Sequence, residues 1–465
     1  MAPEFSTITQ APEIRALVQE GLLERAFHDS LFPRLLFRAA ATPHEWAANV
    51  GDSMFFTAPG LLGVRQKPIV PGADPVPESY ESEQWQATLQ QYASSIDTHM
   101  PTSITAIANL FLRNGQQLGL QAGQTMNRIV RNRMFNAALA GHTVADGIQA
   151  ATTTLRVKRL NGFTTARSSS GSRVRFDTVS GSNPLPVNVF ETGVPAPRNV
   201  IGFTPDIAGD ELGPGVITLD AAVSVIDRDP VVAVDATSIV RVGGGDAVDA
   251  IGALDILDLA AIRSAVSRFW QANVPEMPDG RFHCHLDPTS QNQIFSDPEW
   301  QRLLTSLPDY YMYKQFAVGE LLNCVFYRNN ENPQVDTVQG GASATYDDND
   351  PFAGELFSDG TPAGVKIHRA LFSGQGAIYE YHQGLDQLIT EAGITGKVGE
   401  PAITNNGIRV MTDRIQLIIR APLNRLQDQV SSSWKFIGDW PVRTDATTGD
   451  AARFKRLLVV EHGAA

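Results

Sequence analysis

The sequence has little cysteine, no long apolar run and no excess of positive charge. Its two cysteines, Cys284 and Cys324, form no disulfide framework and are typical of a reducing compartment. No stretch of about 18 uninterrupted apolar residues occurs, so we expect no membrane-spanning helix and no membrane partner. The N-terminal residues lack a basic stretch followed by an apolar run, so we expect no signal peptide. The net charge of −13 argues against a general nucleic-acid binder, because such proteins carry a basic surface.

Motifs for catalysis are weak. The GDS sequence that ends at Ser53 resembles the nucleophile block of one hydrolase class, but no aspartate is followed three residues later by the histidine which that class needs. His283 and His285 share a strand face, and nearby residues do not supply the further ligands of a zinc site. The acidic run Asp347–Asp350 lacks the glycine and the terminal glutamate of a calcium loop. We therefore expect no enzyme, no cofactor and no metal site. The alternative left open is an α+β hydrolase that uses Ser53 or the two histidines.

The composition is that of a folded protein. At 465 residues, with 43% hydrophobic and 19% charged residues, the chain has room for two or three domains. Residues 1–50 predict an N-terminal arm of helical pieces, which Pro33 and Pro43 interrupt. Its apolar residues, among them Leu22 and Leu23, recur near helical spacing. This arm lies either against another surface or against its own domain.

Residues 51–95 predict a protruding β-hairpin. Prolines crowd the stretch between Pro59 and Pro77, and a strand pattern follows in which Trp85 and Leu89 fall on one face and glutamines on the other. Such a hairpin has little core of its own and needs a partner to cover it.

A long helix is predicted over residues 103–139, at the start of a region that extends over 96–176. Apolar residues follow a 3.6-residue period, which gives a length of about 55 Å. Gly115, Gly119 and Gly123 stand four residues apart and each weakens a helix by about 1 kcal/mol relative to alanine. This arrangement favours close packing of another segment on the glycines, and a break near Asn114 is the alternative. We expect inter-subunit charge pairing by the arginines of this helix, which are Arg113, Arg128, Arg131 and Arg133.

The remaining chain is β-rich. Residues 177–245 show short strands and frequent turns, which predicts an inserted β-sandwich or barrel whose return hinge is Gly243–Gly245. Residues 251–275 predict a helix with Leu254, Leu257 and Phe269 on one face. A strand through His283, further strands and an alternating C-terminal stretch complete a body over 251–465. The fold class is α+β with an all-β insert.

This order of elements resembles the major capsid proteins of tailed bacteriophages with the Hong Kong 97-type fold. The stretch 51–97 resembles their extended loop (E-loop), and 102–139 resembles the spine helix of their peripheral (P) domain. The stretch 280–304 resembles a strand and helix of their A-domain. The likeness covers roughly 1–175 and 251–465, and it rests on the order of elements more than on any single motif.

The resemblance implies a structural function. Such proteins self-assemble as hexamers and pentamers into an icosahedral head, the virion shell, which encloses double-stranded DNA without sequence-specific contact. Assembly takes place in the cytoplasm of the bacterial host, with a portal and, in some cases, decoration proteins. The resemblance further implies that Gly115, Gly119, Gly123, Trp85, Leu89, Leu22 and Leu23 pack between subunits. Replacing Gly119 by leucine would then block assembly more than folding.

Two departures from the family pattern limit what is carried over. The type member begins with a long helical scaffolding segment that this chain lacks, so a separate scaffolding protein is expected. The type member also crosslinks its subunits through an E-loop lysine. Lys67 is the only lysine of the hairpin region, but no asparagine partner or catalytic glutamate can be identified, so crosslinking is not predicted. A cellular encapsulin-type shell protein shares the fold and is a further alternative.

Overall fold

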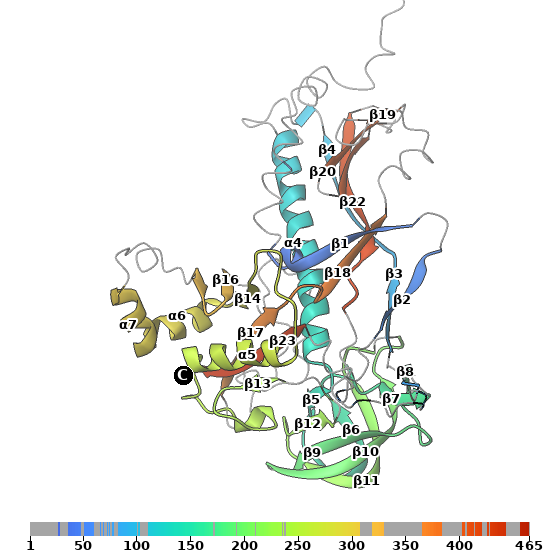
Figure 1. Cartoon of the computed structure of the whole chain (residues 1–465). Coiled ribbons are helices and arrows are strands. Elements are labelled where there is room, and N and C mark those ends of the chain that lie inside the picture. Colours follow the sequence, from blue (N-terminus) through green and yellow to red (C-terminus); the bar gives the residue numbers. More distant parts are fainter. Residues whose placement is uncertain are drawn as a thin grey trace, which may run out of the picture. The chain divides into compact units, whose positions relative to one another are not determined.

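The computed structural model is a sheet-rich α+β protein in two compact units (Figure 1). The first unit contains residues 1–55, 86–131 and 378–441, and the second contains 56–85, 132–377 and 442–465. The structure describes residues 27, 36–47, 51–59, 66, 68, 72, 74, 77–78, 82–99, 101–102, 110–170, 173–191, 193–209, 211–234, 236, 239–306, 319–329, 365–383, 402–404, 407–412, 414–420, 426, 428–442 and 456–464. The expectations for Leu22, Leu23, Lys67 and Asp347–Asp350 lie outside these residues.

A sheet of seven strands forms the first unit. Its order is β1-β18-β22-β21-β20-β19, and β4 pairs with β22 off this path. The strands are β1 (Ala41–Trp46), β4 (Gln90–His99), β18 (Ile378–Gln383), β19 (Ala402–Thr404), β20 (Gly407–Thr412), β21 (Ile415–Arg420) and β22 (Gln429–Asp439). Along β22 every second residue is buried, and Trp434 and Phe436 are 1% exposed. This period of two is typical of a sheet with one covered face.

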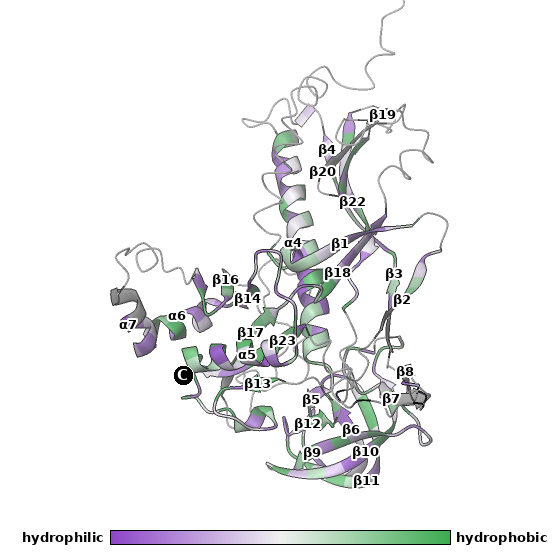
Figure 2. Cartoon of the chain, in the orientation of Figure 1, coloured by the Kyte–Doolittle hydropathy of each residue, from purple (hydrophilic) through white to green (hydrophobic). Residues whose placement is uncertain are grey.

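The predicted long helix is α4 (Leu110–Ala138), 29 residues in length. The sequence predicts it over 103–139, and the structure confirms it as one continuous helix over the described part, without a break at Asn114. Figure 2 shows bands of hydrophobic and hydrophilic residues along α4, as its 3.6-residue period predicts. The side chain of Asn114 donates a 2.8 Å hydrogen bond to Oγ1 of Thr98, which ties this helix to β4.

The N-terminal arm contains a strand that the sequence does not predict. After a single turn of 3-10 helix, η3 (Arg38–Ala40), the chain enters β1, which pairs in parallel with β18. The expectation of helical pieces up to residue 50 is therefore wrong for Ala41–Trp46. This strand contains Pro43 and has a mixed burial pattern, and the strand it pairs with in the described part of the chain lies more than 300 residues away, so no local pattern predicts it.

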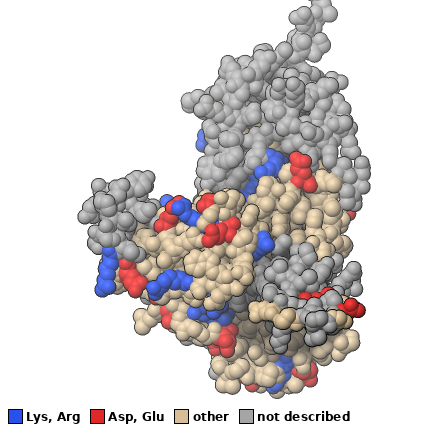
Figure 3. All heavy atoms as spheres, in the orientation of Figure 1, with Lys and Arg blue, Asp and Glu red and all other residues tan. Residues whose placement is uncertain are grey.

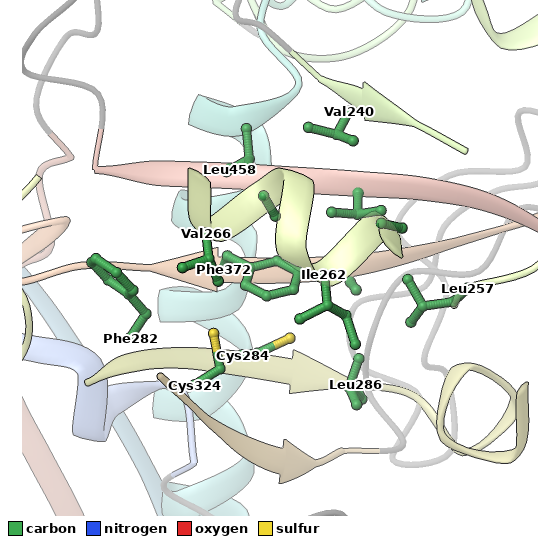
Figure 4. Packing of buried hydrophobic residues seen from close by; sticks show 14 of the residues in the cluster. Val240, Leu257, Ile262, Val266, Phe282, Cys284, Leu286, Cys324, Phe372 and Leu458 are labelled. Atoms are coloured by element: carbon green, nitrogen blue, oxygen red, sulfur yellow. The ribbon is translucent and has the colours of Figure 1, made fainter. Parts of the chain in front are cut away.

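In the second unit, helix α5 (Leu259–Gln271) packs on a mixed sheet (Figure 4). The sheet has the order β13-β23-β17-β14-β16-β15. Cys284 and Phe372 lie between the strands and Ile262 and Val266 of the helix, and Leu458 belongs to the same cluster. Helices α6 (Pro288–Ser296) and α7 (Pro298–Ser306) complete this apolar cluster. The strands are β13 (Val240–Arg241), β14 (Phe282–Leu286), β15 (Glu320–Leu321), β16 (Cys324–Arg328), β17 (Lys366–Ser373) and β23 (Leu457–Ala464).

Helix α5 begins later than the sequence predicts. The carboxylate of Asp258 caps it by accepting from the backbone N–H of Ala261 at 2.7 Å. Residues 251–258 are therefore not helical, and Leu254, which we expected on the buried face, is 90% exposed. Leu257 and Phe269 are buried as predicted.

The predicted β insert is a six-stranded barrel with the order β5-β12-β9-β10-β11-β6. A bridge between Ala145 and Val157 joins the two end strands and closes it. The sequence places its start at 177, but β5 and β6 already belong to the sheet, so the barrel starts at His142. Gly243–Gly245, predicted as the return hinge, have φ of 84°, 85° and 108°, which only glycine adopts readily. They follow Val240–Arg241, which already pair with the C-terminal strand of the other sheet, so the chain leaves the barrel before them. The barrel strands are β5 (His142–Val144), β6 (Gln149–Val157), β9 (Leu185–Glu191), β10 (Val194–Pro205), β11 (Gly215–Val225) and β12 (Pro230–Ala233).

A further sheet of four strands contains the predicted hairpin. Its order is β2-β3-β8-β7, with β2 (Ser53–Pro59) and β3 (Ser82–Thr88) as the hairpin strands. Strands β7 (Thr165–Ser170) and β8 (Arg173–Thr178) form a second hairpin. No helix in the described part of the chain is long and apolar enough to cross a membrane.

Candidate assembly surfaces

The three glycines of α4 lie on its buried face. Gly115, Gly119 and Gly123 are all buried within a single chain. On the same side the helix buries Leu118, Ala122 and Met126, each 0% exposed. Because glycine has no side chain, a row of glycines four residues apart lets another segment approach the helix backbone closely.

Asn127 is the next residue of this row, and it shows what kind of group lies there. Its side-chain oxygen accepts a 2.8 Å hydrogen bond from the backbone N–H of Phe37, which lies just before η3. The chain's own N-terminal segment thus contacts the helix at this point. Since Gly119 is already buried in one chain, we expect a leucine there to disturb folding as well as any contact between subunits.

The arginines of α4 differ in exposure. Arg113 is exposed and Arg133 is half-buried, whereas Arg128 is 7% exposed and Arg131 is fully buried. Arg128, Arg131 and Arg133 each already interact with other groups of the same chain. Arg113 is therefore the most accessible of the four in a single chain.

The hairpin formed by β2 and β3 exposes an aromatic side chain. Phe55 is 70% exposed, while its neighbour Phe56 stacks on Trp85 with 6.0 Å between ring centroids. Trp85 and Ala87 are buried, as the predicted alternation requires. Leu89 lies between β3 and β4, where its backbone N–H donates to the carbonyl of Asp52 at 2.8 Å. The alternating burial therefore ends at Ala87, whereas the sequence predicts it to continue to Leu89.

A buried ionic clamp holds the N-terminal segment, and sequence reasoning missed it. The guanidinium of Arg38 donates to both carboxylate oxygens of Glu380, at 2.9 and 2.6 Å. Arg414 donates to the same carboxylate at 3.0 Å. Although burial raises the pKa of Glu380, hydrogen bonds from Arg38 and the positive charges of both arginines lower it more, so that the carboxylate is held ionised. The only sequence signal was Arg38 itself, a charged residue in an apolar stretch.

The groups considered for catalysis do not form a reactive site. Ser53 Oγ lies 3.0 Å from Oγ1 of Thr88, a hydroxyl that cannot act as a general base. His283 lies on β14 and its Nε2 is 2.9 Å from Oδ2 of Asp279. His285 is fully buried against Tyr327, and burial lowers its pKa to about 3. Among the described residues, no group of three or more His, Cys, Asp or Glu is placed to hold a metal ion.

One cluster has the residue types of a hydrolase but is sealed. Ser290 Oγ lies 2.8 Å from Nε2 of His462 and donates a hydrogen bond to Oδ1 of Asp287. The other carboxylate oxygen of Asp287, Oδ2, lies 2.7 Å from Nδ1 of His368. All four residues are at most 4% exposed. Asp287 caps the start of α6 through the backbone N–H of Ser290, so the cluster has a structural explanation.

Charges are interspersed on the face that Figure 3 shows. Lys and Arg alternate there with Asp and Glu among the described residues, and neither sign gathers into one broad patch. On this face, therefore, the described residues form no broad basic patch of the kind that nucleic-acid binding uses.

Comparison with known proteins finds similarity in structure alone. No protein-family model and no curated protein sequence matches the chain. Among solved structures, the capsid asymmetric unit of cyanophage Pam1 is 9% identical and aligns over 94% of this chain and 93% of its own, with a TM-score of 0.51. The capsid of Ralstonia phage GP4 is 11% identical and aligns over 92% of this chain and 90% of its own, with a TM-score of 0.45. The capsid of cyanophage P-SCSP1u is 10% identical and aligns over 93% of this chain and 88% of its own, with a TM-score of 0.46. The likeness to Pam1 shows that the chain has a phage capsid protein fold.

Proposed function

We propose that the chain is the major capsid protein of a tailed bacteriophage and builds an icosahedral head from hexamers and pentamers. The observation that carries the proposal is the fold match to the Pam1 capsid over 94% of the chain. In this proposal the fold is of the Hong Kong 97 type. Residues 1–50 are the N-arm, β2 and β3 the E-loop, and α4 the spine helix of the P-domain. The barrel is an insertion domain, and the sheet beneath α5 belongs to the A-domain.

Assembly in this proposal uses surfaces that one chain leaves incomplete. Phe55 is 70% exposed on a hairpin with few buried residues of its own, so a neighbouring subunit gains by covering it. Arg113, which is exposed on α4, is a candidate for a contact along the spine, and the row Gly115, Gly119 and Gly123, already buried within one chain, is the weaker candidate. Each contact can be weak, because a subunit in a shell is held by several neighbours at once.

The net charge suits a container for DNA better than a DNA-binding protein. At −13 the chain repels nucleic acid at long range and limits adhesion of packaged DNA to the wall. We propose a separate scaffolding protein and a portal as partners, assembly in the host cytoplasm, and a final place in the virion.

Electron microscopy of the purified chain, expressed alone and together with its genomic neighbours, tests the proposal. We expect rings, capsomers, tubes or closed shells in at least one of the two preparations. A protein that stays a monomer of 50.4 kDa in both preparations, by mass in solution, would overturn the proposal. Esterase activity that disappears in Ser53→Ala would instead favour the hydrolase.

A further inference from the structure

One end of the barrel opens between two neighbouring strands. The ladder between β10 and β11 stops at the pair Val200 and Leu219. At the next position the carboxylate of Asp220 takes the place of a backbone partner, and it accepts from the backbone N–H and the side chain of Asn199 at 3.0 and 2.7 Å. Beyond this point β10 keeps its described ladder with β9, and β11 keeps its described ladder with β6. The two strands therefore separate toward Val194.

A groove of about 470 Å³ lies at this opening. Its apolar lining comes from the ends of three strands and the turn before β6, and Ile148, Val194 and Ile226 are 80%, 65% and 40% exposed. Three large aliphatic side chains exposed around one groove are typical of an interaction site, because leaving them in water is unfavourable. The groove also contains Ala150, Ala196 and Glu191.

The strand edge beside the groove is poorly suited to pairing with a further strand. Pro195 and Pro197 remove two backbone donors from this part of β10. The carbonyl oxygen of Pro197 accepts from Nη1 of Arg198 at 2.8 Å. An occupant would therefore be held by side chains in the groove more than by backbone hydrogen bonds.

Carboxylates surround the groove. Glu191 lies in its wall and accepts from the backbone N–H of Ser224 at 3.3 Å. The side chain of Asp227, next to Ile226, is 46% exposed. Asp249 belongs to the 3-10 helix η4 (Val248–Ala250) and lies beside Gly193, in the turn between β9 and β10. Its Oδ2 is 3.7 Å from the position that a side chain on Gly193 would take.

The cations nearby are already engaged. Arg156 donates to Asp146 and Asp206, at 3.0 and 2.6 Å. Arg198 donates to two backbone carbonyls, and Nε of Arg228 lies 3.9 Å from Oδ2 of Asp227, whose Oδ1 accepts from the backbone N–H of Gly147 at 2.9 Å. The groove is thus apolar inside and acidic at its rim. A second copy of this chain would bring the same carboxylates to a symmetric contact, which like-charge repulsion disfavours.

We propose that this groove is a docking site for another protein, which inserts an apolar side chain flanked by Lys or Arg. The partner's aliphatic group would cover Ile148, Val194 and Ile226, and its cation would face Glu191 in the wall of the groove. This site goes beyond shell assembly, since the groove is complete in a single chain.

Disulfide tethering on the full-length protein tests the chemistry of the groove. A cysteine introduced by Val194→Cys is offered three N-acetyl dipeptides joined to cysteamine: Leu-Lys, Leu-Glu and Ser-Lys. The native cysteines, Cys284 and Cys324, are 0% exposed and do not compete. Intact mass measures labelling at equilibrium with mercaptoethanol. We expect Leu-Lys to exceed Ser-Lys about tenfold, because a leucine side chain is buried. We expect labelling by Leu-Lys to exceed labelling by Leu-Glu about threefold, because ion pairs between partly exposed charges are weak.

Gly181→Cys is the matched control, since a side chain there meets open space on the same barrel. It should label equally with all three probes. Adding Glu191→Gln to Val194→Cys should remove most of the preference for Leu-Lys over Leu-Glu and keep the preference for leucine. Equal labelling at both positions would overturn the proposal, and so would a dominant disulfide dimer through Val194→Cys, which would indicate a second copy. Shell formation is scored separately by microscopy, so failure of the proposed function would not imitate either result.

Discussion

The barrel and the sheet beneath α5 are both six-stranded, yet they differ in where they bury charge. In the described barrel, buried charged residues such as Arg228 and Asp229 lie in turns, and the strands bury almost only aliphatic residues. In the other sheet they lie on the strands themselves. Glu461 on β23 is 1% exposed and binds Arg241 of β13 and Arg369 of β17, at 3.0 and 2.9 Å.

The two sheets are therefore stabilised by different kinds of interaction. Aliphatic burial stabilises without regard to partner or pH, because it is non-directional. Buried ionic groups contribute little net stability, but breaking one pair is costly, and their geometry favours one register. In the sheet beneath α5, successive residues of β23 face opposite ways. Val460 joins the apolar cluster under α5, and Glu461 joins the arginines. We infer that the barrel is the robust region and that this sheet is the sensitive one.

The largest expected effect is that acid unfolds the sheet beneath α5 before the barrel. Burial lowers the pKa of His285 to about 3 and that of His462 to about 4. Both values lie below that of an unfolded histidine, so the unfolded chain binds more protons and stability falls as the pH drops below 6.5. Two such histidines together cost about 4 kcal/mol by pH 5. Labelling of Cys284 and Cys324 by dithiodipyridine in urea, at pH 7 and pH 5, measures the loss.

A variant that lacks one of these histidines separates the contribution of the histidines to the pH dependence of stability from that of the carboxylates. His285→Leu should lose only about half as much stability between pH 7 and pH 5. Asp287 and Glu461, whose pKa values are lowered by His368 and by the two arginines, lose their contribution only as the pH falls below the unfolded carboxyl range, near 4. His283→Gln, which changes the half-buried histidine of the same strand, is the control. An unfolding midpoint that is the same at both pH values would contradict the assignment.

The second prediction breaks the ionic cluster at constant pH. Glu461→Gln leaves Arg241 and Arg369 buried without a balancing charge, and we expect a loss of about 3 kcal/mol. The same cysteine labelling in urea measures it. Val460→Ala in the neighbouring position is the apolar reference, and its effect should not depend on salt. If Glu461→Gln were neutral, these charges would not be what makes the sheet sensitive.

The sequence predicts local elements well and long-range ones poorly. The 3.6-residue period predicts α4, and alternation predicts the burial of Trp85 and Ala87, because both patterns lie within a few residues. The pairing of β1 with β18 joins segments that no local pattern relates. The clamp of Arg38 on Glu380 has the same origin.

For the candidate assembly surfaces, the sequence predicts close packing on α4, and packing between subunits stays a prediction. The glycine row on α4 predicts close packing, and all three glycines are buried within the single chain. The sequence does not say that Asn127 continues the row and binds the backbone of Phe37, since that contact depends on the fold of the N-terminal segment. The groove at the end of the barrel has no sequence signal either, because Asp220 ends the ladder only through its side-chain geometry.

The third prediction tests the barrel's side of the comparison. Ile217→Val removes one methylene group from a fully buried position and should cost about 1 kcal/mol. The loss should be equal at pH 7 and pH 5, since no titrating group changes. Val231→Cys, a near-isosteric reporter at 0% exposure, allows the same labelling measurement in the barrel. A strong pH dependence of this loss would show that barrel and sheet unfold as one cooperative unit.

The smallest effect on a single chain is expected at Phe55, which belongs to neither of the two cores. Because the side chain is 70% exposed, Phe55→Ser should change the stability of the isolated chain by less than about 0.5 kcal/mol. In the proposed shell a neighbour covers this residue, so the same change should raise the protein concentration needed for assembly severalfold. Light scattering during assembly, with microscopy of the products, measures the shift. Phe56→Ser is the matched control, since Phe56 stacks on Trp85 and its loss should weaken the hairpin itself. If Phe55→Ser assembled like the unchanged chain, this part of β2 would not be a subunit contact, and the exposed Phe55 would need another partner.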